Sequence, residues 1–400
     1  MRCCMAVQRR IGLVPPRYGD DVVGGAELVL REAAHGLAAR GWDVEVLTTC
    51  ARDHFTWANH YAPGAEEDGK VLVRRFPTVT DTGGNDRRVI EAEMLQGLPV
   101  TVQRQHIWMN DGLRVPELYQ HLLVNAESYR ALVFSPYLFW TTFACGQISP
   151  ERTILRPCLH DEPYARLELF QPLFSGVRGV WFNAEPERDL AESIFHLPTR
   201  QCVVGEGFDV PTTYDPDGFR SRYGIEGRFI LYGGRREGAK RWEWLLDAFA
   251  DATVAYDLPF SLVTFGSGEV DPPEQIADRV IDLGFVSTAD RNDAFAAADA
   301  YVQPSSLESF SRTVMEAWLA GTPVIANDDS AVVRWHCERS GAGLTFIDEE
   351  ELAQCLRFVA DEPAAARSLA ARGRDYVLEH YQWPSVLDVM EQTIEEWLPA

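Results

Sequence analysis

Short apolar runs alternate along this chain with segments in which apolar residues recur at the spacing of an amphipathic helix. The runs are short and rich in β-branched residues, and the first of them, IGLV at residues 11–14, is typical of a buried strand. Polar turns containing Gly and Pro separate the two kinds of segment. The alternation predicts successive βα units around parallel sheets.

The first βα unit is the clearest. Residues 11–14 are predicted to form a strand, residues 26–41 a helix, and residues 43–49 the next strand. Gly41 stands just past the helix, where a left-handed cap is favourable. Further strands are predicted over residues 71–76, 131–135, 153–158 and 179–183, and a mostly helical segment over residues 89–129; residues 202–211 end this half of the chain.

The pattern restarts after TTYDPDG, residues 212–218, a polar and turn-rich run that we interpret as a linker. At 400 residues the chain is also too long for one ordinary core. We therefore expect an α/β fold with two Rossmann-like, doubly wound domains, residues 1–205 and 206–380, facing each other across a cleft with ligands outside the carboxyl ends of the strands. Residues 381–400 are predicted to form an amphipathic helix that crosses back to the first domain. The strands expected in the second domain cover residues 228–234, 261–268, 280–286, 300–305 and 323–328.

The net charge of −23 is concentrated in the second half, where residues 206–400 carry 35 acidic and 16 basic side chains. This excess of negative charge repels the phosphate backbone of nucleic acids, so we expect no nucleic-acid partner. No uncharged apolar stretch approaches the roughly 18 residues of a membrane span, and the first residues lack the apolar core of a secretory signal. We therefore expect no transmembrane segment and a cytoplasmic protein. The eight cysteines show no zinc-like spacing and are interpreted as reduced thiols.

The most informative segment is PSSLESFSRTVMEAWLAGTPVIA, residues 304–326. A loop leads into a predicted helix near Ser311, and the first N–H groups of a helix bind anions together with its dipole. Glu308 precedes this junction and Glu316 lies within the helix. Because ionised carboxylates only accept hydrogen bonds, their place beside a phosphate site indicates recognition of sugar or ribose hydroxyls. The alternative is that Glu308 starts the helix and Glu316 is a solvated helix position.

A second segment, YGGRREGAKR at residues 232–241, follows a predicted strand directly. Its glycines permit a tight turn, and Arg235 and Lys240 can converge on one anion. Lys240 and Lys70 are the only lysines among 37 basic residues, which sets Lys240 apart from the arginines used elsewhere. The alternative is a loop of solvated surface cations.

These two segments resemble the retaining glycosyltransferase family 4, the glycosyltransferase group 1 type. The first is similar to its signature of Pro-Ser, Glu, Phe and a later Glu-Ala before a G-x-P-V strand start. The second resembles its G-R-x-x-x-x-K loop, although Arg241 stands where the family has a glycine. The resemblance implies the GT-B fold, with the donor in the second domain and the acceptor in the first.

The resemblance also implies roles for individual residues. Glu308 matches the glutamate at the donor sugar's hydroxyls, and Glu316 the one at the nucleotide ribose. Arg235 and Lys240 match the cations that hold the donor diphosphate. The backbone implied to cradle that diphosphate belongs to Phe310, Ser311 and Arg312.

Weaker matches lie elsewhere in the chain. VVGGAE, residues 22–27, resembles the loop that places Gly25 near the donor phosphate, although on its own it is equally a tight Rossmann turn. His160 matches the histidine that faces the transferred sugar; a lone histidine is otherwise more often structural. Gly266 and Gly268 match a glycine turn at the donor site, and Phe285–Val286 match the edge that binds the base.

Other features bear on the metal and the acceptor. Asp215–Asp217 (DPD) mimics a D-x-D metal motif, but its place in a predicted linker argues against that role, so we expect no metal or cofactor. The aromatic segments at residues 106–111 and 136–143 could line an acceptor groove, although core packing is favoured. The family usually has a His-rich element where this chain has SPYLFW, residues 135–140.

The sequence thus predicts a metal-independent, retaining hexosyl transfer from a nucleotide-diphosphate sugar to a hydroxyl-bearing small-molecule, glycan or lipid-linked acceptor. Two alternatives remain open at this point. One is a sugar-nucleotide epimerase on the same fold, and the other is a non-catalytic sugar-nucleotide binding protein.

Overall fold

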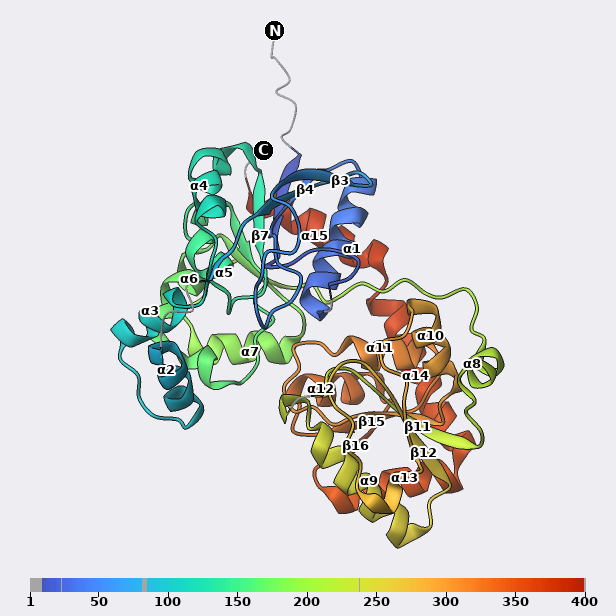
Figure 1. Cartoon of the computed structure of the whole chain (residues 1–400). Coiled ribbons are helices and arrows are strands. Elements are labelled where there is room, and N and C mark those ends of the chain that lie inside the picture. Colours follow the sequence, from blue (N-terminus) through green and yellow to red (C-terminus); the bar gives the residue numbers. More distant parts are fainter. Residues whose placement is uncertain (1–8, 23, 81–84, 237, 399–400) are drawn as a thin grey trace. The chain divides into compact units, whose positions relative to one another are not determined.

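The computed structural model describes residues 9–22, 24–80, 85–236 and 238–398. The chain forms two compact units: one runs to Gly207 and resumes at Trp383, and the other is Phe208–Gln382. Each unit has a central, mainly parallel sheet flanked by helices (Figure 1). The α/β class with two doubly wound units, predicted from the alternating pattern, is confirmed.

The sheet of the first unit has the order β10-β9-β8-β7-β1-β2-β4-β3. All neighbours in it are parallel except β3, which runs antiparallel to β4 at the edge. Strand β1 pairs with β2 on one side and with β7 on the other, so the winding direction reverses between β1 and β7. The strands are β1 (Arg10–Val14), β2 (Asp43–Thr49), β3 (Gly64–Asp68), β4 (Val71–Phe76), β7 (Ala131–Phe134), β8 (Thr153–Leu155), β9 (Gly179–Phe182) and β10 (Gln201–Val203).

Helix α15 (Trp383–Trp397) belongs to the first unit although it ends the chain. It packs with α1 (Gly25–Ala39), as Figure 1 shows, and buries Leu387, Met390 and Ile394 in the same core. The other helices of the unit are α2 (Asn85–Leu95), α3 (Val102–Asn110), α4 (Pro116–Asn125), α5 (Trp140–Cys145), α6 (Gln171–Gly176) and α7 (Glu185–Ile194), and a small ribbon pairs β5 (Val79–Thr80) with β6 (Leu113–Arg114).

The sheet of the second unit has the order β13-β12-β11-β14-β15-β16 and is parallel throughout. Here the winding reverses between β11 and β14, so the connections that follow these two strands meet at one point of the sheet edge. The strands are β11 (Arg228–Gly233), β12 (Phe260–Phe265), β13 (Val280–Asp282), β14 (Ala300–Gln303), β15 (Val324–Asn327) and β16 (Leu344–Phe346). The helices are α8 (Pro216–Tyr223), α9 (Trp242–Tyr256), α10 (Thr288–Ala297), α11 (Arg312–Leu319), α12 (Ala331–Ser340), α13 (Glu349–Asp361) and α14 (Pro363–His380).

The interpretation of residues 212–218 as a linker is wrong for its second half. Asp215 is the N-cap of α8, and its carboxylate accepts a 3.0 Å hydrogen bond from the N–H of Gly218. Pro216 occupies the first helical turn, where its missing N–H costs nothing. Asp-Pro-Asp is therefore a helix start in this chain.

The described part of the chain contains neither a membrane-spanning helix nor a disulfide bond. None of its helices combines the length and apolar character that a membrane crossing requires. Its six cysteines, Cys50, Cys145, Cys158, Cys202, Cys337 and Cys355, are all unpaired thiols.

Candidate functional site

The connection from β14 to α11 is held in a defined turn. Ser311, the N-cap of α11, is buried with φ 73°, in the left-handed region that non-glycine residues rarely adopt. The side-chain amide of Gln303, at the end of β14, donates a 2.8 Å hydrogen bond to Ser311 Oγ. The first N–H groups of α11 have no partner inside the helix, so this turn presents donors and the positive end of the helix dipole.

The side chain of Phe310 packs into the core and so holds this turn in place. It is buried and makes edge-to-face contacts with His336 at 4.9 Å and with Tyr381 at 5.0 Å between ring centroids. Burial lowers the pKa of His336 to about 3, so this ring stays neutral beneath the turn. Arg312, the first residue of α11, places its guanidinium over the ring of Phe208 at 4.4 Å. What these residues offer to a ligand is therefore their backbone.

Lys240 and Glu308 meet at the reversal point between β11 and β14. Lys240 Nζ donates a 2.6 Å hydrogen bond to Glu308 Oε1, and both side chains are largely buried. A charged pair with this geometry holds each head in place more firmly than a solvent-exposed pair would. Two residues that the sequence placed in one site are thus in direct contact.

The loop after β11 is shaped by an arginine that sequence reasoning did not select. Arg236 is buried, and its guanidinium donates to the carbonyl oxygen of Gly268 at 2.9 Å and to the carboxylate of Asp282. A Cβ on Gly266 would lie 1.9 Å from the carbonyl oxygen of Gly234, and one on Gly268 would lie 2.8 Å from that of Arg236. The two predicted glycines therefore permit close packing of the loops after β11 and β12.

Arg235 is half-buried, and its carbonyl oxygen accepts a 2.6 Å hydrogen bond from the hydroxyl of Tyr232. This bond fixes the backbone of the predicted cationic loop where it leaves β11. Glu237, inside the same loop, lies outside the described residues.

Glu316 is largely buried in α11, and one of its two carboxylate oxygens has a hydrogen-bonding partner. Its Oε1 lies 3.1 Å from the guanidinium of Arg291 on α10, whereas Oε2 has no hydrogen-bond donor among the described residues. The side chain is only 9% exposed. An unpaired carboxylate oxygen in such a place is costly, which makes it a strong acceptor for a ligand hydroxyl. Arg291 was not predicted as a site residue, because nothing in the sequence distinguishes it from the other arginines.

Phe285 and Val286 follow β13 at the same edge of the sheet. The ring of Phe285 is 70% exposed, and Val286 is half-buried. An exposed phenylalanine at the carboxyl edge of a sheet offers an apolar face for a planar group.

In the first unit, the predicted glycine loop leads into α1. Gly25 is the first residue of α1 and is exposed, with open space where a Cβ would stand. Gly24 is the sterically required residue, because a Cβ there would lie 2.2 Å from a carboxylate oxygen of Glu27. Glu27 in turn forms a buried 2.6 Å ion pair with Arg17, which follows β1. Val23 lies outside the described residues.

His160 lies in the connection that follows β8. Its Nδ1 is 3.9 Å from Glu162 Oε1, and the same oxygen accepts a 2.9 Å hydrogen bond from the hydroxyl of Tyr137. Burial raises the pKa of Glu162. The ring of His160 is partly exposed, so it can reach a ligand.

The backbone beside His160 is held by a buried carboxyl that the sequence did not single out. Glu187, near the start of α7, accepts hydrogen bonds from the N–H of Leu159 at 2.6 Å and from the N–H of Asn183 at 2.5 Å. Burial raises the pKa of Glu187 to about 8. Its sequence position, in the first turn of a helix, is that of an ordinary exposed acidic residue and gave no signal of this role.

The candidate site in the second unit thus combines a cation, a helix N-terminus and two largely buried carboxylates at the reversal point of a parallel sheet. His160 and Gly25 belong to the first unit. Within the described residues, no three His, Cys, Asp or Glu side chains gather as metal ligands.

Comparisons with known proteins identify the family of the chain. Residues 227–362, most of the second unit, match the family model described as Glycosyl transferases group 1. D-inositol 3-phosphate glycosyltransferase from Rhodococcus opacus is 30% identical over 418 residues, which cover 94% of this chain and 86% of that protein.

Two solved structures are similar over nearly the whole chain. Sucrose-phosphate synthase from Thermosynechococcus elongatus has a TM-score of 0.73 at 18% identity, covering 97% of this chain and 98% of that one. HepE from Anabaena, solved in complex with UDP-glucose, has a TM-score of 0.69 at 17% identity, covering 97% and 99%.

The fold is therefore that of the GT-B enzymes. The chain belongs to the group 1 glycosyltransferases of family 4, and it is a glycosyltransferase.

Proposed function

We propose that this glycosyltransferase moves a sugar, with retention of anomeric configuration, from a nucleotide-diphosphate donor to a hydroxyl of its acceptor, without a divalent metal. The observation that carries the proposal is the pairing of Lys240 with Glu308 beside the helix N-terminus at Ser311. A leaving diphosphate needs positive charge, and a sugar needs hydrogen-bond acceptors. This site supplies both.

The donor is assigned to the second unit. Glu316 offers its unpaired Oε2 to a ribose hydroxyl, and the exposed ring of Phe285 with Val286 offers a face to the base. Glu308 accepts a hydrogen bond from a hydroxyl of the sugar. HepE, which shares the fold, was solved with UDP-glucose, and this supports a donor of the same class.

The chemistry follows from these positions. As the bond between the anomeric carbon and the phosphate oxygen breaks, negative charge develops on the diphosphate. Lys240, Arg235 and the backbone from Phe310 to Arg312 stabilise that charge. The acceptor oxygen attacks the same face of the sugar, and its proton passes to the departing phosphate oxygen. The first unit contributes Gly25 and His160, which we assign to the phosphate and the transferred sugar.

The acceptor carries a hydroxyl group and belongs to the first unit. The Rhodococcus relative is named for glycosyl transfer to D-inositol 3-phosphate, which supports a small polyol or a molecule containing one. An epimerase or a non-catalytic binding protein gains no such support, because the matched family and this relative are named for transfer.

The donor class is tested by thermal shift with UDP, GDP, ADP and their glucose or mannose conjugates. A ligand at a hundred times its Kd stabilises by about 2.7 kcal/mol, so one base should raise the unfolding midpoint by several degrees. Stereochemistry is tested by NMR on the sugar released or transferred from an α-linked donor. The first product should be the α-anomer. A β-anomer in the NMR experiment contradicts the proposal, and so does an unfolding midpoint that no nucleoside diphosphate raises.

A further inference from the structure

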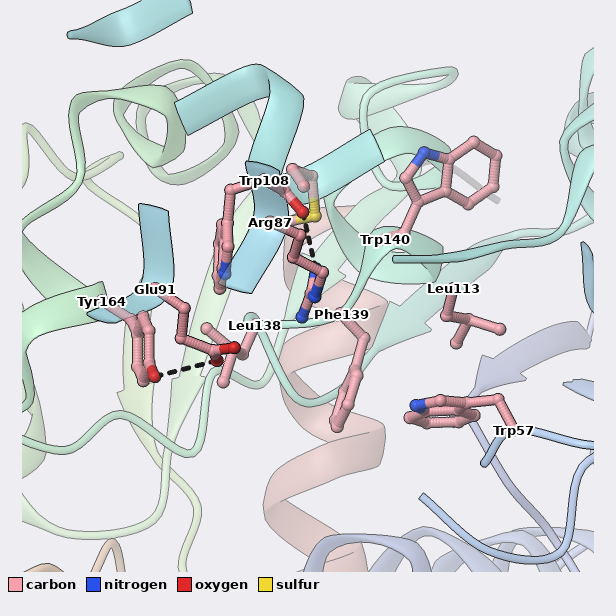
Figure 2. Close-up of a pocket in the computed structure, with 10 residues that line it drawn as sticks. Trp57, Arg87, Glu91, Trp108, Leu113, Leu138, Phe139, Trp140 and Tyr164 are labelled. Atoms are coloured by element: carbon pink, nitrogen blue, oxygen red, sulfur yellow. Dashed lines mark hydrogen bonds between the residues drawn. The ribbon is translucent and has the colours of Figure 1, made fainter. Parts of the chain in front are cut away.

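The first unit contains a pocket of about 110 Å³ that the donor chemistry does not use. Figure 2 shows the residues that line it: half of them are aromatic, and the others are three aliphatic side chains, one cation and one carboxylate. The pocket is partly open to solvent, and a volume of this order suits one six-membered ring, since a cavity of about 150 Å³ holds benzene. Its lining includes Trp57, Arg87, Glu91, Trp108, Phe139 and Tyr164.

The pocket lies where a doubly wound sheet binds its ligands. Phe139 comes from the connection after β7, the strand at which the winding reverses, and Trp57 from the connection after β2. Tyr164 belongs to the connection after β8, which also carries His160. The aromatic segments of the sequence therefore reach the ligand edge of the sheet and are not used for core packing alone.

The aromatic rings that line the pocket contact one another in two pairs. Trp57 and Phe139 meet edge to face at 5.2 Å between centroids, and Trp108 stacks on Tyr164 at 5.3 Å. Trp57, Phe139 and Tyr164 are each only half-buried, so part of each ring is open to a ligand. Aromatic faces of this kind attract apolar C–H groups.

The polar groups of the pocket are fixed in place. Arg87 and Glu91 stand one turn apart on α2; Arg87 donates to the carbonyl oxygen of Trp108 at 2.5 Å, and Glu91 accepts from the hydroxyl of Tyr164 at 3.1 Å (Figure 2). An arginine can only donate hydrogen bonds and an ionised glutamate can only accept them. The buried indole N–H of Trp108 has no acceptor among the described residues. An oxygen entering the pocket would satisfy it.

We propose that this pocket binds one polyhydroxylated six-membered ring, a pyranose or a cyclitol, of the acceptor. Such a ring has C–H faces for Trp57 and Phe139 and a rim of hydroxyls that both donate to Glu91 and accept from Arg87. An acyl chain would form no hydrogen bond with either charged group, and a phosphate would be repelled by Glu91. The inference rests on the proposed function, because it locates the acceptor of the same reaction.

The test is a titration of intrinsic tryptophan fluorescence without donor, since Trp57, Trp108 and Trp140 all line the pocket. The probes are methyl α-glucopyranoside, methyl α-mannopyranoside and myo-inositol, each up to 100 mM. Benzyl alcohol is the control compound, because its six-membered ring is apolar. We expect a saturable change with at least one polyol. Phe139→Ala should weaken that binding about tenfold, and Glu91→Gln, which keeps its shape, about fivefold. Phe55→Ala, a 76% exposed ring in the same connection as Trp57, should leave it unchanged.

The outcomes separate this inference from the proposed function. The inference is overturned if no polyol binds, if benzyl alcohol binds as well as the polyols, or if both pocket variants bind like the wild type. Thermal shift by nucleoside diphosphates on the same preparation reports the donor site independently. Diphosphate binding without polyol binding removes the inference alone, and polyol binding without any diphosphate binding removes the proposed function.

Discussion

Lys240 Nζ lies 2.6 Å from Glu308 Oε1 and joins two connections whose residues are 68 positions apart in the sequence. The two strands that carry these connections, β11 and β14, are neighbours at the reversal point of the sheet. The pair therefore couples the group proposed to stabilise the diphosphate to the group proposed to hold the sugar. Replacing either side chain changes the environment of both, so the variants must be compared with matched controls.

Lys240→Ala should slow transfer by roughly 100- to 1,000-fold, because a preorganised charge at the leaving group is worth about 3–4 kcal/mol in the transition state. The measurement is kcat under donor saturation. Lys70→Ala removes the only other lysine, which is exposed in the first unit, and should behave as the wild type. A Lys240→Ala enzyme within threefold of the wild-type rate would remove Lys240 from the reaction.

Glu316→Gln should weaken nucleoside diphosphate binding by about 10- to 100-fold, since a hydrogen bond to a charged group contributes roughly 1.5–3 kcal/mol. The unpaired Oε2 is the atom expected to bind the ribose. Isothermal titration with the diphosphate chosen by thermal shift measures the change. Glu338→Gln, on the exposed face of α12, serves as the control. Equal affinities for Glu316→Gln and the control would exclude the ribose assignment.

Glu308→Gln should separate the sugar from the nucleotide. Its affinity for the free diphosphate should stay within about threefold of the wild type, while the transfer rate falls at least tenfold through the lost charge-assisted bond. The two quantities are measured by titration and by steady-state kinetics. Parallel loss of both would mean that Glu308 acts on the diphosphate through Lys240.

Glu187 makes the stability of the first unit depend on pH. Burial raises the pKa of this carboxyl from 4.5 to about 8, so the folded protein holds a proton that the unfolded chain releases near neutral pH. The resulting stabilisation is complete below about pH 4.5 and is lost as the pH rises through 8. We expect the thermal midpoint to fall between pH 6 and 9 in the wild type.

Glu187→Gln removes this titration and also turns an amide NH₂ toward one of the two backbone N–H donors. The variant should therefore be less stable at pH 6 by roughly 1–3 kcal/mol and should lose less of its stability on going to pH 9. Glu192→Gln changes an exposed glutamate on the same helix and should keep the wild-type slope. An unchanged slope in Glu187→Gln would assign the pH dependence to another group.

Two internal strands of the first sheet were predicted with their observed bounds. Residues 43–49 and 71–76 carry the apolar signature of internal strands, and β2 and β4 have these bounds. Strand β3, GAEED, was missed because an exposed antiparallel edge strand needs no apolar residues. Gly41 adopts φ 89°, as its position after a helix predicted.

The site was predictable from sequence only for residues with a local signature. Glu308 and Lys240 stand in recognisable loops, but their contact depends on the neighbouring strands β11 and β14. Arg236, Arg291 and Glu187 have no local signature, because their roles arise from partners brought together by the fold. The lining of the pocket in Figure 2 comes from the connections after β2, β7 and β8 and from α2, α3, β6 and α5, so no single segment of the sequence could reveal it.

Activity should persist in excess EDTA after exhaustive dialysis. The leaving diphosphate develops negative charge, and enzymes meet this need either with a metal held by carboxylates or with fixed cations and helix dipoles. In this chain Lys240 contacts Glu308 in the connection that leads into α11, and the Asp215–Asp217 motif starts α8. A Mg²⁺ ion at the same diphosphate would compete with Lys240 for the phosphate oxygens, so added metal should change the rate by less than about threefold. Transfer is measured with EDTA, with Mg²⁺ and with Mn²⁺ on one dialysed sample. Loss of activity in EDTA that Mn²⁺ or Mg²⁺ restores would show that the fixed charges are insufficient and that a carboxylate of the site also binds metal.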